Sequence, residues 1–425
     1  MEQMYAKTRA ELMGKVFADP FYWINKGRIP IGTLFGSPDF YTESDVVWIP
    51  FDSVDESSSF TTRALFNLLL LGGSGDGKSL LNKVIWYFMQ KAGYKVCYIE
   101  AAKLDEAARA AWPWKSSRLP PHVEAERIPL THYIPSFVAR TVDDSFIHNF
   151  RVYASNLSDL IDAEYWMSMG LPRTGASIVA RIIQDLNEGG KDVSVQAVRE
   201  RVKFQLDDDS IFKATYTSIN NVLMDVQENK IFDGKPLELY DAWQEKNSVV
   251  ISYDDVMAAR YMVFDVGQLI KKASRYATTK KMKTPMLFIF GDASSFLKGK
   301  IEFVESNMAL NETRKLGNNY RSKGLNGILE IQSVDLVDST IAETFKIKII
   351  SPLFANPASL AQLNIPAEVI KNLNPESGRL HRDKDNHDLT WQLVLEDGSH
   401  VRFRPFTPPC MHFTQKYRYK EVAEV

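Results

Sequence analysis

The feature that most constrains this chain is a glycine-rich segment that directly follows a run of leucines. The leucines occupy residues 68–71, and residues 72–79 read Gly-Gly-Ser-Gly-Asp-Gly-Lys-Ser. A glycine, four residues, then glycine, lysine and serine is the pattern of a phosphate-binding loop. Apolar residues at helical spacing follow, from Leu80 to Met89. The sequence therefore predicts a buried strand, a phosphate loop and a helix, in that order.

The residue types in this loop suit the chemistry of phosphate groups. Glycines let the backbone turn so that successive N–H groups point at phosphate oxygens, and the helix N-terminus adds partial positive charge. Lys78 would reach the β- and γ-phosphates, and the Ser79 hydroxyl would hold Mg²⁺. The expected cofactors are therefore ATP and Mg²⁺. The candidate binding residues are Gly72, Gly73, Ser74, Gly75, Asp76, Gly77, Lys78, Ser79 and Leu80. A glycine-rich turn with a chance lysine is the structural alternative, which the flanking strand and helix disfavour.

Composition limits the classes of protein to which this chain can belong. Of its 425 residues, 45% are hydrophobic and 24% are charged, as in ordinary globular proteins. The net charge of −2 excludes a uniformly basic nucleic-acid binder, so any such contact must come from a local patch. No run approaches the roughly 20 apolar residues that span a bilayer. The two cysteines, Cys97 and Cys410, lie far apart. We therefore expect a protein of the reducing cytoplasm without a signal peptide.

Apolar runs and turn residues predict the other strands of an α/β domain. The expected strands cover residues 29–34, 46–51, 94–101, 248–253, 285–291, 325–332 and 345–351. An Asp397-Gly398 turn predicts a hairpin between residues 390–395 and 400–403, whose second strand should end at Pro405. Helical periodicity instead recurs in three stretches between residues 150 and 226, where glycine is sparse, and Ser194 resembles an N-cap. Two long helical regions are expected at residues 256–279 and 296–323.

The resulting organisation is an α/β nucleotide-binding domain into which an all-helical lobe is inserted. The expected parts are an N-terminal helix with edge strands (1–60), the first part of the nucleotide-binding domain (61–140), the helical insertion (141–245), the second part of the nucleotide-binding domain (246–352), and a small β appendage with a tail (353–425).

Two carboxylates fall at the ends of predicted strands. Asp292 closes the apolar run 285–291, and Glu100 lies near the end of the strand 94–101. Because ligands of parallel α/β sheets bind outside the carboxyl ends of the strands, both side chains are candidates for the site. Asp292 would hold Mg²⁺ through water or through Ser79, and Glu100 would polarise the attacking water. A solvent-facing or helix-capping carboxylate is an equally good interpretation of Glu100.

The order of these elements resembles the HerA–FtsK superfamily of hexameric DNA translocases. A helical lobe after the second strand of the domain is most similar to the type IV coupling proteins of bacterial conjugation. The resemblance covers residues 28–352. Its more specific part runs from Leu287 through Asp292 to the basic residues before Gly324 and to Gln332 at a strand end. It implies a RecA-like, mostly parallel sheet flanked by helices.

The resemblance also assigns roles to residues of this sequence. Lys78 and Ser79 would bind phosphates and Mg²⁺, as the loop itself predicts, and Asp292 would be the aspartate of the second nucleotide motif. Gln332 would sense the γ-phosphate. Arg321, with Arg314 second, would reach the nucleotide of a neighbouring subunit and stabilise transition-state charge. From the residues alone, a helix-end charge that is favourable to the helix dipole is the better interpretation of Arg321, and only the resemblance makes the role at a neighbouring nucleotide comparable.

Ala293 departs from the pattern of the family. A glutamate usually follows the second-motif aspartate there and activates the attacking water, which alanine cannot do because it has no proton-accepting group. Three explanations remain open. Glu100, Asp254 or Asp255 supplies the carboxylate, a deliberate substitution traps bound ATP, or the protein binds ATP and hydrolyses it poorly.

A local excess of basic residues suggests where DNA would bind. Residues 271–323 contain twelve lysines and arginines against four acidic residues. Lys280, Lys281 and Lys283 are the candidates for contact with DNA in a ring channel. The alternative is that these charges are solvated helix faces, as charge runs usually are.

The leading functional hypothesis is an ATP-driven motor that translocates DNA in conjugation or type IV secretion as a homo-oligomeric ring, expected to be a hexamer. The alternatives are a secretion-system ATPase that energises protein transfer or pilus assembly, and an ATP-gated assembly subunit with weak hydrolysis. Coupling proteins usually carry N-terminal membrane helices, which this sequence lacks. Three explanations stay open: the protein does not dock at the membrane, the sequence is truncated, or this is a soluble variant. We expect a cytoplasmic protein that is peripheral at the inner membrane through secretion-system or relaxase partners.

Overall fold

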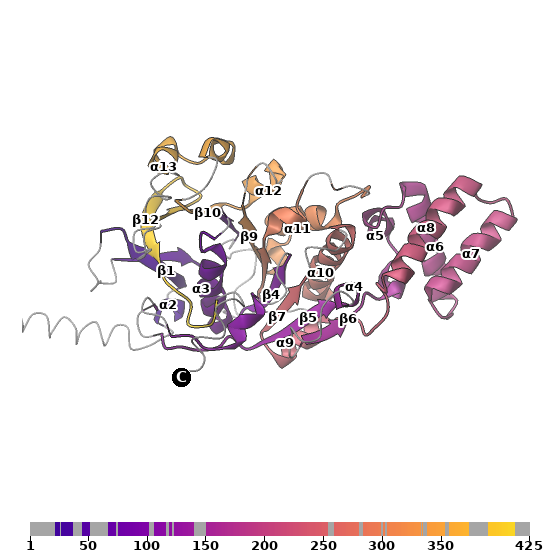
Figure 1. Ribbon diagram of the computed structural model, residues 1–425, viewed down its shortest axis with the longest axis horizontal. Helices are drawn as coiled ribbons and strands as arrows, with labels where there is room; N and C mark the ends of the chain where they lie inside the picture. The colour runs from indigo at the N-terminus through magenta and orange to yellow at the C-terminus, as the bar shows by residue number, and fades with distance from the viewer. Residues whose placement is uncertain are drawn as a thin grey trace, which may run out of the picture.

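The protein is built on one large mixed sheet, with helices on both faces (Figure 1). The structure, a computed structural model, describes residues 22–25, 27–36, 45–51, 67–73, 75–101, 106–115, 119–120, 123–139, 150–253, 259–279, 284–298, 301, 304–332, 334, 338–352, 357–373 and 390–412. The strands are β1 (Arg28–Leu34), β2 (Val46–Pro50), β3 (Asn67–Leu71), β4 (Lys95–Glu100), β5 (Leu130–Pro135), β6 (Phe150–Tyr153), β7 (Ser248–Ser252), β8 (Met286–Gly291), β9 (Leu325–Ile331), β10 (Ile347–Ile350), β11 (Trp391–Val394) and β12 (His400–Pro405). The α-helices are α2 (Tyr22–Asn25), α3 (Lys78–Lys91), α4 (Ser136–Ala139), α5 (Ala163–Ser168), α6 (Arg173–Glu188), α7 (Val195–Asp207), α8 (Lys213–Glu228), α9 (Leu239–Glu245), α10 (Ala259–Thr279), α11 (Met308–Asn318), α12 (Ser339–Thr344) and α13 (Ala367–Asn372).

The order of the strands brings the ends of the most apolar strands together. From one edge to the other, the order is β2-β1-β12-β11-β10-β3-β9-β8-β4-β7-β5-β6. All neighbours from β10 to β6 are parallel, whereas β10, β11, β12, β1 and β2 pair antiparallel. The carboxyl ends of the parallel strands therefore meet at one edge of the sheet, where α/β proteins bind ligands. The predicted α/β class and mostly parallel sheet are confirmed.

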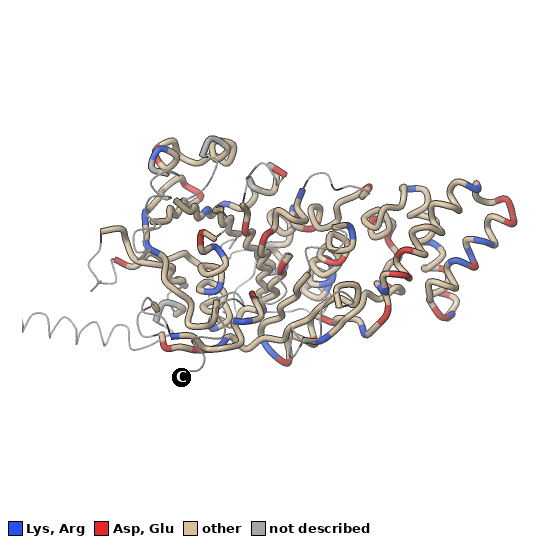
Figure 2. The backbone as a smooth tube through the Cα atoms, in the orientation of Figure 1, with Lys and Arg blue, Asp and Glu red and all other residues tan. Residues whose placement is uncertain are grey.

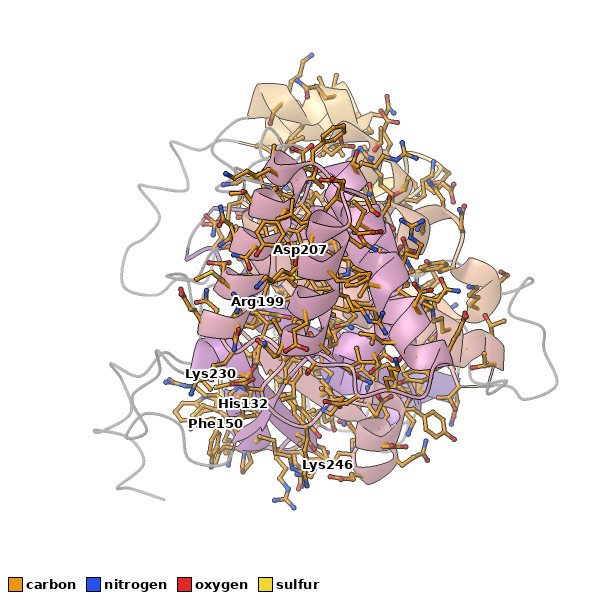
Figure 3. All side chains as sticks on the ribbon, turned by 90° about the vertical axis from the view of Figure 1, so that its right-hand side faces the viewer. His132, Phe150, Arg199, Asp207, Lys230 and Lys246 are labelled. Atoms are coloured by element: carbon orange, nitrogen blue, oxygen red, sulfur yellow. The ribbon has the colours of Figure 1, made fainter. Side chains whose placement is uncertain are left out.

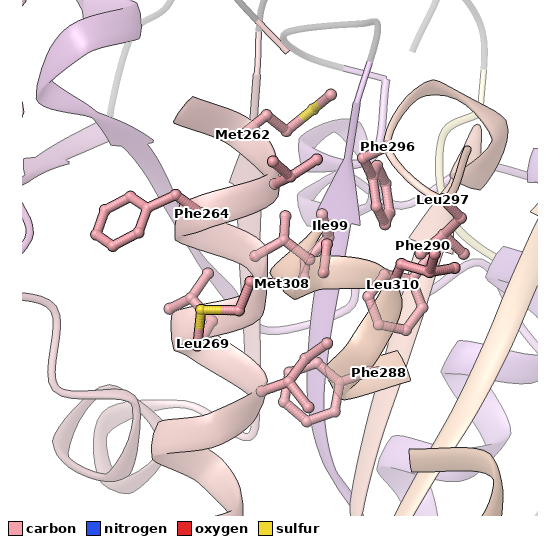
Figure 4. Packing of buried hydrophobic residues seen from close by; sticks show 14 of the residues in the cluster. Ile99, Met262, Phe264, Leu269, Phe288, Phe290, Phe296, Leu297, Met308 and Leu310 are labelled. Atoms are coloured by element: carbon pink, nitrogen blue, oxygen red, sulfur yellow. The ribbon is translucent and has the colours of Figure 1, made fainter. Parts of the chain in front are cut away.

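Each parallel strand is apolar on both faces because helices cover both sides of the sheet. On β8, Leu287 and Ile289 pack into the cluster that includes α3, whereas Phe288 and Phe290 pack into a second cluster with α10 and α11. Figure 4 shows the second cluster, in which Leu269 of α10 lies beside Met308 of α11. Gly267 permits this close approach, because a Cβ there would lie 2.5 Å from the side chain of Met308.

A helical lobe projects from the sheet beyond β6 (Figure 1). Two of the three predicted apolar stripes are confirmed, since Ile182 and Leu186 of α6 and Leu223 of α8 are buried in its core. The hydroxyl of Ser194 accepts a hydrogen bond of 3.2 Å from the backbone N–H of Ala197, so the predicted N-cap of α7 is also confirmed.

Two predicted helical regions are wrong in part. Residues 150–153 form β6, because their aromatic and β-branched side chains and their backbone groups pair with β5. The short 3₁₀ helix Leu157–Asp159 follows, capped by the side chain of Asn156. Residues 296–323 are not one helix, because Asn307 caps α11 and the chain ends that helix at Asn318, before a 3₁₀ turn over residues 321–323.

The C-terminal hairpin belongs to the main sheet and not to a separate appendage. β11 pairs with β10, and β12 pairs with β1, so the hairpin covers the edge that β10 would otherwise expose. Trp391, Leu393 and Phe403 are buried in the same cluster as α3. The β12 strand ends at Pro405, as predicted. The predicted boundaries at residues 61, 141 and 353 lie outside the described residues and stay predictions.

Other expectations concern cysteines and membrane segments. Cys97 and Cys410 are both free and buried. Among the helices that the structure describes, none has the length and apolar character needed to cross a bilayer.

Candidate functional site

A pocket of about 270 Å³ lies at the carboxyl edge of the parallel strands, where α3 begins. Its lining combines the glycine-rich loop with residues at the ends of several strands. The residues are Gly75, Asp76, Gly77, Lys78, Ser79, Leu80, Tyr98, Glu100, Glu106, Gly291, Asp292, Glu330, Gln332 and His412. The structure thus places the predicted loop, Glu100, Asp292 and Gln332 around one cavity.

The loop has the backbone geometry that its glycines allow. Gly75 and Gly77 adopt left-handed φ angles of 82° and 90°, which side chains with a Cβ rarely adopt. Gly77 is the N-cap residue of α3, and its carbonyl accepts the helix bond from Leu81 at 3.1 Å. The N-terminus of a fourteen-residue helix therefore faces the pocket, and its free N–H groups suit an anion. Ser74 lies outside the described residues.

Lys78 is folded over the loop at the floor of the pocket. Its ammonium donates hydrogen bonds to the carbonyls of Gly72 at 2.9 Å and Gly73 at 2.6 Å, and only 4% of the side chain is exposed. A buried cation that is held by backbone oxygens at this position can pair with the phosphates of a nucleotide.

Three predicted site residues at or after strand ends line the pocket: Glu100, Asp292 and Gln332. Glu100 is buried at the end of β4, and its carboxylate accepts a hydrogen bond of 2.9 Å from the backbone N–H of Ala107. Glu100 therefore both lines the pocket and caps a backbone N–H group, so both interpretations of this residue apply. Asp292 has a left-handed φ of 53° directly after β8, and its carboxylate accepts a hydrogen bond of 2.8 Å from Ser294. Gln332 follows β9 in the pocket wall.

Sequence reasoning missed Glu330, which lies on β9 two residues before Gln332. Its carboxylate accepts hydrogen bonds from the hydroxyl of Ser79 at 3.1 Å and from the amide of Asn82 at 2.9 Å. The period of two along a strand puts Glu330 and Gln332 on the same face, so the pattern could have suggested this residue.

His412 is a second residue that the sequence did not indicate. The C-terminal segment runs beside residues 112–114, where Met411 donates to the carbonyl of Trp112 at 2.9 Å, and this pairing brings His412 to the pocket. Burial, and next the nearby Lys83 ammonium, lower the pKa of His412 to about 4. Lys83 itself is fully buried on α3, donates to the carbonyls of Glu106 and Met411, and has its pKa lowered by burial.

Ala293 does not face the pocket. It is completely buried in the cluster on the opposite side of the sheet from α3, which also contains Phe290, Phe296 and Leu297. The chain turns at Asp292 into a short 3₁₀ helix over residues 293–295, and this turn directs the side chain of Ala293 into the core.

The two candidate arginines differ in how much the structure describes. Arg321 begins the 3₁₀ turn between α11 and β9, and its side chain lies outside the described residues. Arg314 forms an ion pair of 2.7 Å with Asp338 and donates to Thr340 at 3.0 Å. Its guanidinium is thus engaged within its own chain. Asp254 and Asp255 also lie outside the described residues.

The basic region is partly neutralised by acids of the helical lobe and its neighbours. Lys271 of α10 pairs with Asp162 at 2.8 Å, and Lys272 pairs with Asp159 at 3.1 Å. Figure 2 shows the two signs of charge interspersed along the chain. The side chains of Lys271 and Lys272 are only 16% and 11% exposed, so for these two lysines the ion pairs replace both expectations, the DNA contact and the solvated helix face. Lys280, Lys281 and Lys283 lie outside the described residues.

Solved structures of other proteins share this arrangement of strands and helices. The structure of VirB4 of Thermoanaerobacter pseudethanolicus aligns over 90% of this chain and 96% of its own, with a TM-score of 0.58 and 13% identity. The plasmid coupling protein TrwB in complex with the GTP analogue GDPNP aligns over 91% and 98%, with a TM-score of 0.52 and 12% identity. The chain has the fold of VirB4 and TrwB. The resemblance to coupling proteins that the sequence predicts is thereby confirmed at the level of the fold.

Another structure with this fold is TrwB in complex with ADP and Mg²⁺, with a TM-score of 0.51, 13% identity and coverage of 91% and 98%. Comparisons with protein-family models and with curated protein sequences find no match. The similarity to VirB4 and TrwB therefore comes from the arrangement of strands and helices.

Proposed function

We propose that this protein is a P-loop ATPase that binds and hydrolyses ATP with Mg²⁺ in the pocket beside Lys78. The observation that supports this most is the convergence of Lys78 with Asp292 and Gln332, from separate parts of the chain, on one pocket. The fold shared with TrwB, which has been solved with ADP and Mg²⁺, supports the same cofactors.

We assign a separate role in binding and hydrolysing ATP to each group of residues in the pocket. The loop N–H groups and the N-terminus of α3 hold the phosphates, and the ammonium of Lys78 pairs with the β- and γ-phosphates. Gln332 contacts the γ-phosphate. Arg321 of a neighbouring copy reaches the same phosphate in a ring and stabilises the charge that develops during transfer.

The donor set fits Mg²⁺. The hydroxyl of Ser79 and the carboxylates of Asp292 and Glu330 are oxygen donors, which this cation prefers. The described residues contain no group of three or more His, Cys, Asp and Glu that could hold a metal by themselves. Mg²⁺ in nucleotide sites is usually held by one or two carboxylates together with the substrate phosphates. When bound, the ion neutralises negative charge on the phosphates.

Glu100 is the residue that we propose for the attacking water. Its carboxylate lines the pocket, and the N–H of Ala107 fixes its orientation. It can accept a hydrogen bond from a water and take its proton as attack proceeds. Ala293 has no proton-accepting group and is buried in the core, so we assign it no part in this step.

The work that ATP drives is DNA translocation by a homo-oligomeric ring, a hexamer, in conjugative transfer or type IV secretion. Such a motor acts at the inner membrane through relaxase or secretion-system partners. A second candidate is an ATPase that energises protein transfer or pilus assembly. The ion pairs of Lys271 and Lys272 favour it, because they withdraw two cations from the region proposed for DNA.

ATP turnover of the full chain, measured with and without DNA, tests these functions, with Lys78→Ala as the control for the pocket. We expect turnover that DNA stimulates, assembly into a ring in ATP, and loss of both turnover and ring assembly in the variant. Turnover without stimulation would support protein transfer. Assembly in ATP without turnover would support the nucleotide-gated assembly subunit, and absence of ATP binding would contradict all three.

A further inference from the structure

Successive side chains of a strand point to opposite faces of the sheet, and this determines which residues at the carboxyl ends of the strands face α3. On β8, Leu287 and Ile289 point to the α3 side, so the next residue of the same parity, Gly291, also does. Gly291 has no side chain. The end of β8 therefore presents no carboxylate to α3, and Asp292 follows only after the chain has turned.

The space beside Gly291 is filled by Tyr98 of β4. A Cβ at residue 291 would lie 3.1 Å from Cε1 and 3.4 Å from the hydroxyl oxygen of Tyr98. Asp292, one residue after Gly291, does not continue the α3-facing positions of β8, and its backbone is left-handed. Its carboxylate accepts a hydrogen bond from the hydroxyl of Ser294. The position where β8 would offer a carboxylate to the start of α3 is thus occupied by an aromatic ring.

Glu330, on the neighbouring strand β9, supplies a carboxylate beside Gly291. The pair Phe290–Leu329 is in register between β8 and β9, so Glu330 stands next to Gly291 in the sheet. On its other side, Glu330 is in register with Leu70 of β3, the strand that leads into the loop. The hydroxyl of Ser79 and the amide of Asn82, both on α3, donate to its two carboxylate oxygens.

The contact between Ser79 and Glu330 bears on which carboxylate would hold the metal. In P-loop ATPases, the hydroxyl of the loop serine and an acidic residue of a nearby strand hold Mg²⁺ together. Here the hydroxyl of Ser79 lies 3.1 Å from Glu330, which is only 6% exposed. A carboxylate so close to the hydroxyl can accept hydrogen bonds from waters on the ion and orient the serine oxygen toward it.

We propose that Glu330 of β9, and not Asp292 after β8, is the carboxylate that holds Mg²⁺ together with Ser79. The proposal rests on the proposed function, because it assigns the metal of the same nucleotide site. Asp292 is then available to contact waters at the mouth of the pocket. This assignment would let β8 end in Gly291, which has no side chain, without loss of the metal.

The test compares nucleotide affinity with and without the metal. The full chain, Glu330→Gln and the matched variant Asp292→Asn are titrated with a fluorescent ADP analogue in Mg²⁺ and in EDTA. The wild type should bind the analogue more tightly in Mg²⁺. Glu330→Gln should lose about tenfold of this enhancement, the size expected when a residue that supports a metal ligand is removed. Its affinity in EDTA should stay within about twofold, because the loop still holds the phosphates.

A second readout follows the ion itself. With Mn²⁺ in place of Mg²⁺, electron paramagnetic resonance should show less protein-bound Mn²⁺ in the nucleotide complex of Glu330→Gln than in Asp292→Asn. Glu330→Asp keeps the charge but shortens the side chain. It should fall between wild type and Glu330→Gln, and it replaces the latter if that variant does not fold.

Three outcomes overturn the proposal while the proposed function stands. These are full Mg²⁺ enhancement in both Glu330 variants, loss of enhancement in Asp292→Asn alone, and equal loss of affinity in Mg²⁺ and EDTA, which would mean that Glu330 only supports the loop. If the wild type does not bind the analogue under either condition, the proposed function itself fails.

Discussion

The carboxylate of Asp76, inside the glycine-rich loop, accepts a hydrogen bond of 2.8 Å from the hydroxyl of Ser351 beyond the end of β10. The same carboxylate accepts a bond of 2.5 Å from the backbone N–H of Gly73. The loop is thus tied to the neighbouring strand by a negative charge that is 93% buried, since only 7% of Asp76 is exposed. This charge lies in the part of the chain that we propose binds the phosphates.

Asp76→Asn should tighten the binding of ADP. The substitution removes a negative charge beside the phosphates, while the amide oxygen can still accept from Ser351 or from Gly73. At an effective dielectric constant near 20, a unit charge a few ångströms away contributes about 2–4 kcal/mol, of which water and salt screen a large part, so we expect about a tenfold lower Kd. Isothermal titration calorimetry with ADP at low salt measures the effect.

The matched control for this charge change is Asp207→Asn. Asp207 lies on α7 in the helical lobe, which Figure 3 shows end-on, and it does not line the pocket. It should leave the Kd unchanged. An equal or weaker affinity in Asp76→Asn would mean that its hydrogen bonds position the loop more than its charge opposes the nucleotide.

Ala293→Glu should destabilise the protein and should not raise ATP turnover. The side chain of residue 293 points into an apolar core, where an unpaired carboxylate costs several kcal/mol. Thermal unfolding and ATP turnover of the variant measure the two effects. Ser295→Glu, in the same 3₁₀ helix but partly exposed, is the control and should change the melting temperature little. A stable Ala293→Glu variant with faster turnover would show that the missing glutamate is the limiting group.

Lys280→Glu combined with Lys281→Glu should weaken DNA binding if these residues line a channel. Each lost phosphate contact lowers the magnitude of the slope of log K against log salt by about 0.7–0.9, so the double variant should lose about 1.4–1.8 from the slope. Fluorescence anisotropy with labelled DNA at several salt concentrations measures it. Lys271→Met is the control, because its ammonium is already paired with Asp162. Unchanged slopes in the double variant would exclude both lysines from the interface.

The stability of the protein should fall as the pH drops from 6.5 toward 4. The folded state holds His412 neutral with a pKa of about 4, whereas the unfolded chain binds a proton near the ordinary value of 6.5. Between these values the unfolded state binds more protons, so acid favours it, by about 2 kcal/mol once partial exposure is taken into account.

The measurement for His412 is urea unfolding of wild type and His412→Gln at pH 7 and pH 5. The wild type should lose more of its free energy of unfolding between the two pH values than the variant. Equal losses would mean that the imidazole is protonated in the folded state as easily as in the unfolded chain.

Local patterns in the sequence determined much of the fold. The loop at residues 72–79, the buried strands and the stripe of α6 each depend on residues a few positions apart, so motif and periodicity reveal them. The same holds for Asp292 and Gln332, because the end of an apolar run marks the end of a strand. Short segments depend more on their surroundings: residues 150–153 have apolar residues at helical spacing but form a strand, because the neighbouring strand β5 supplies their hydrogen bonds.

Only the tertiary structure decided which distant groups meet. Ser79 and Glu330 are separated by 251 residues, and Asp76 and Ser351 by 275, so no local pattern connects them. The arrival of His412 at the pocket and the pairing of Lys271 with Asp162 depend in the same way on how the whole chain closes. The sequence by itself thus determined the phosphate loop and the class of the fold, because both arise from local backbone and apolar patterns. The order of the strands decided which carboxylate lies beside the loop serine, since this contact exists only after distant strands have paired.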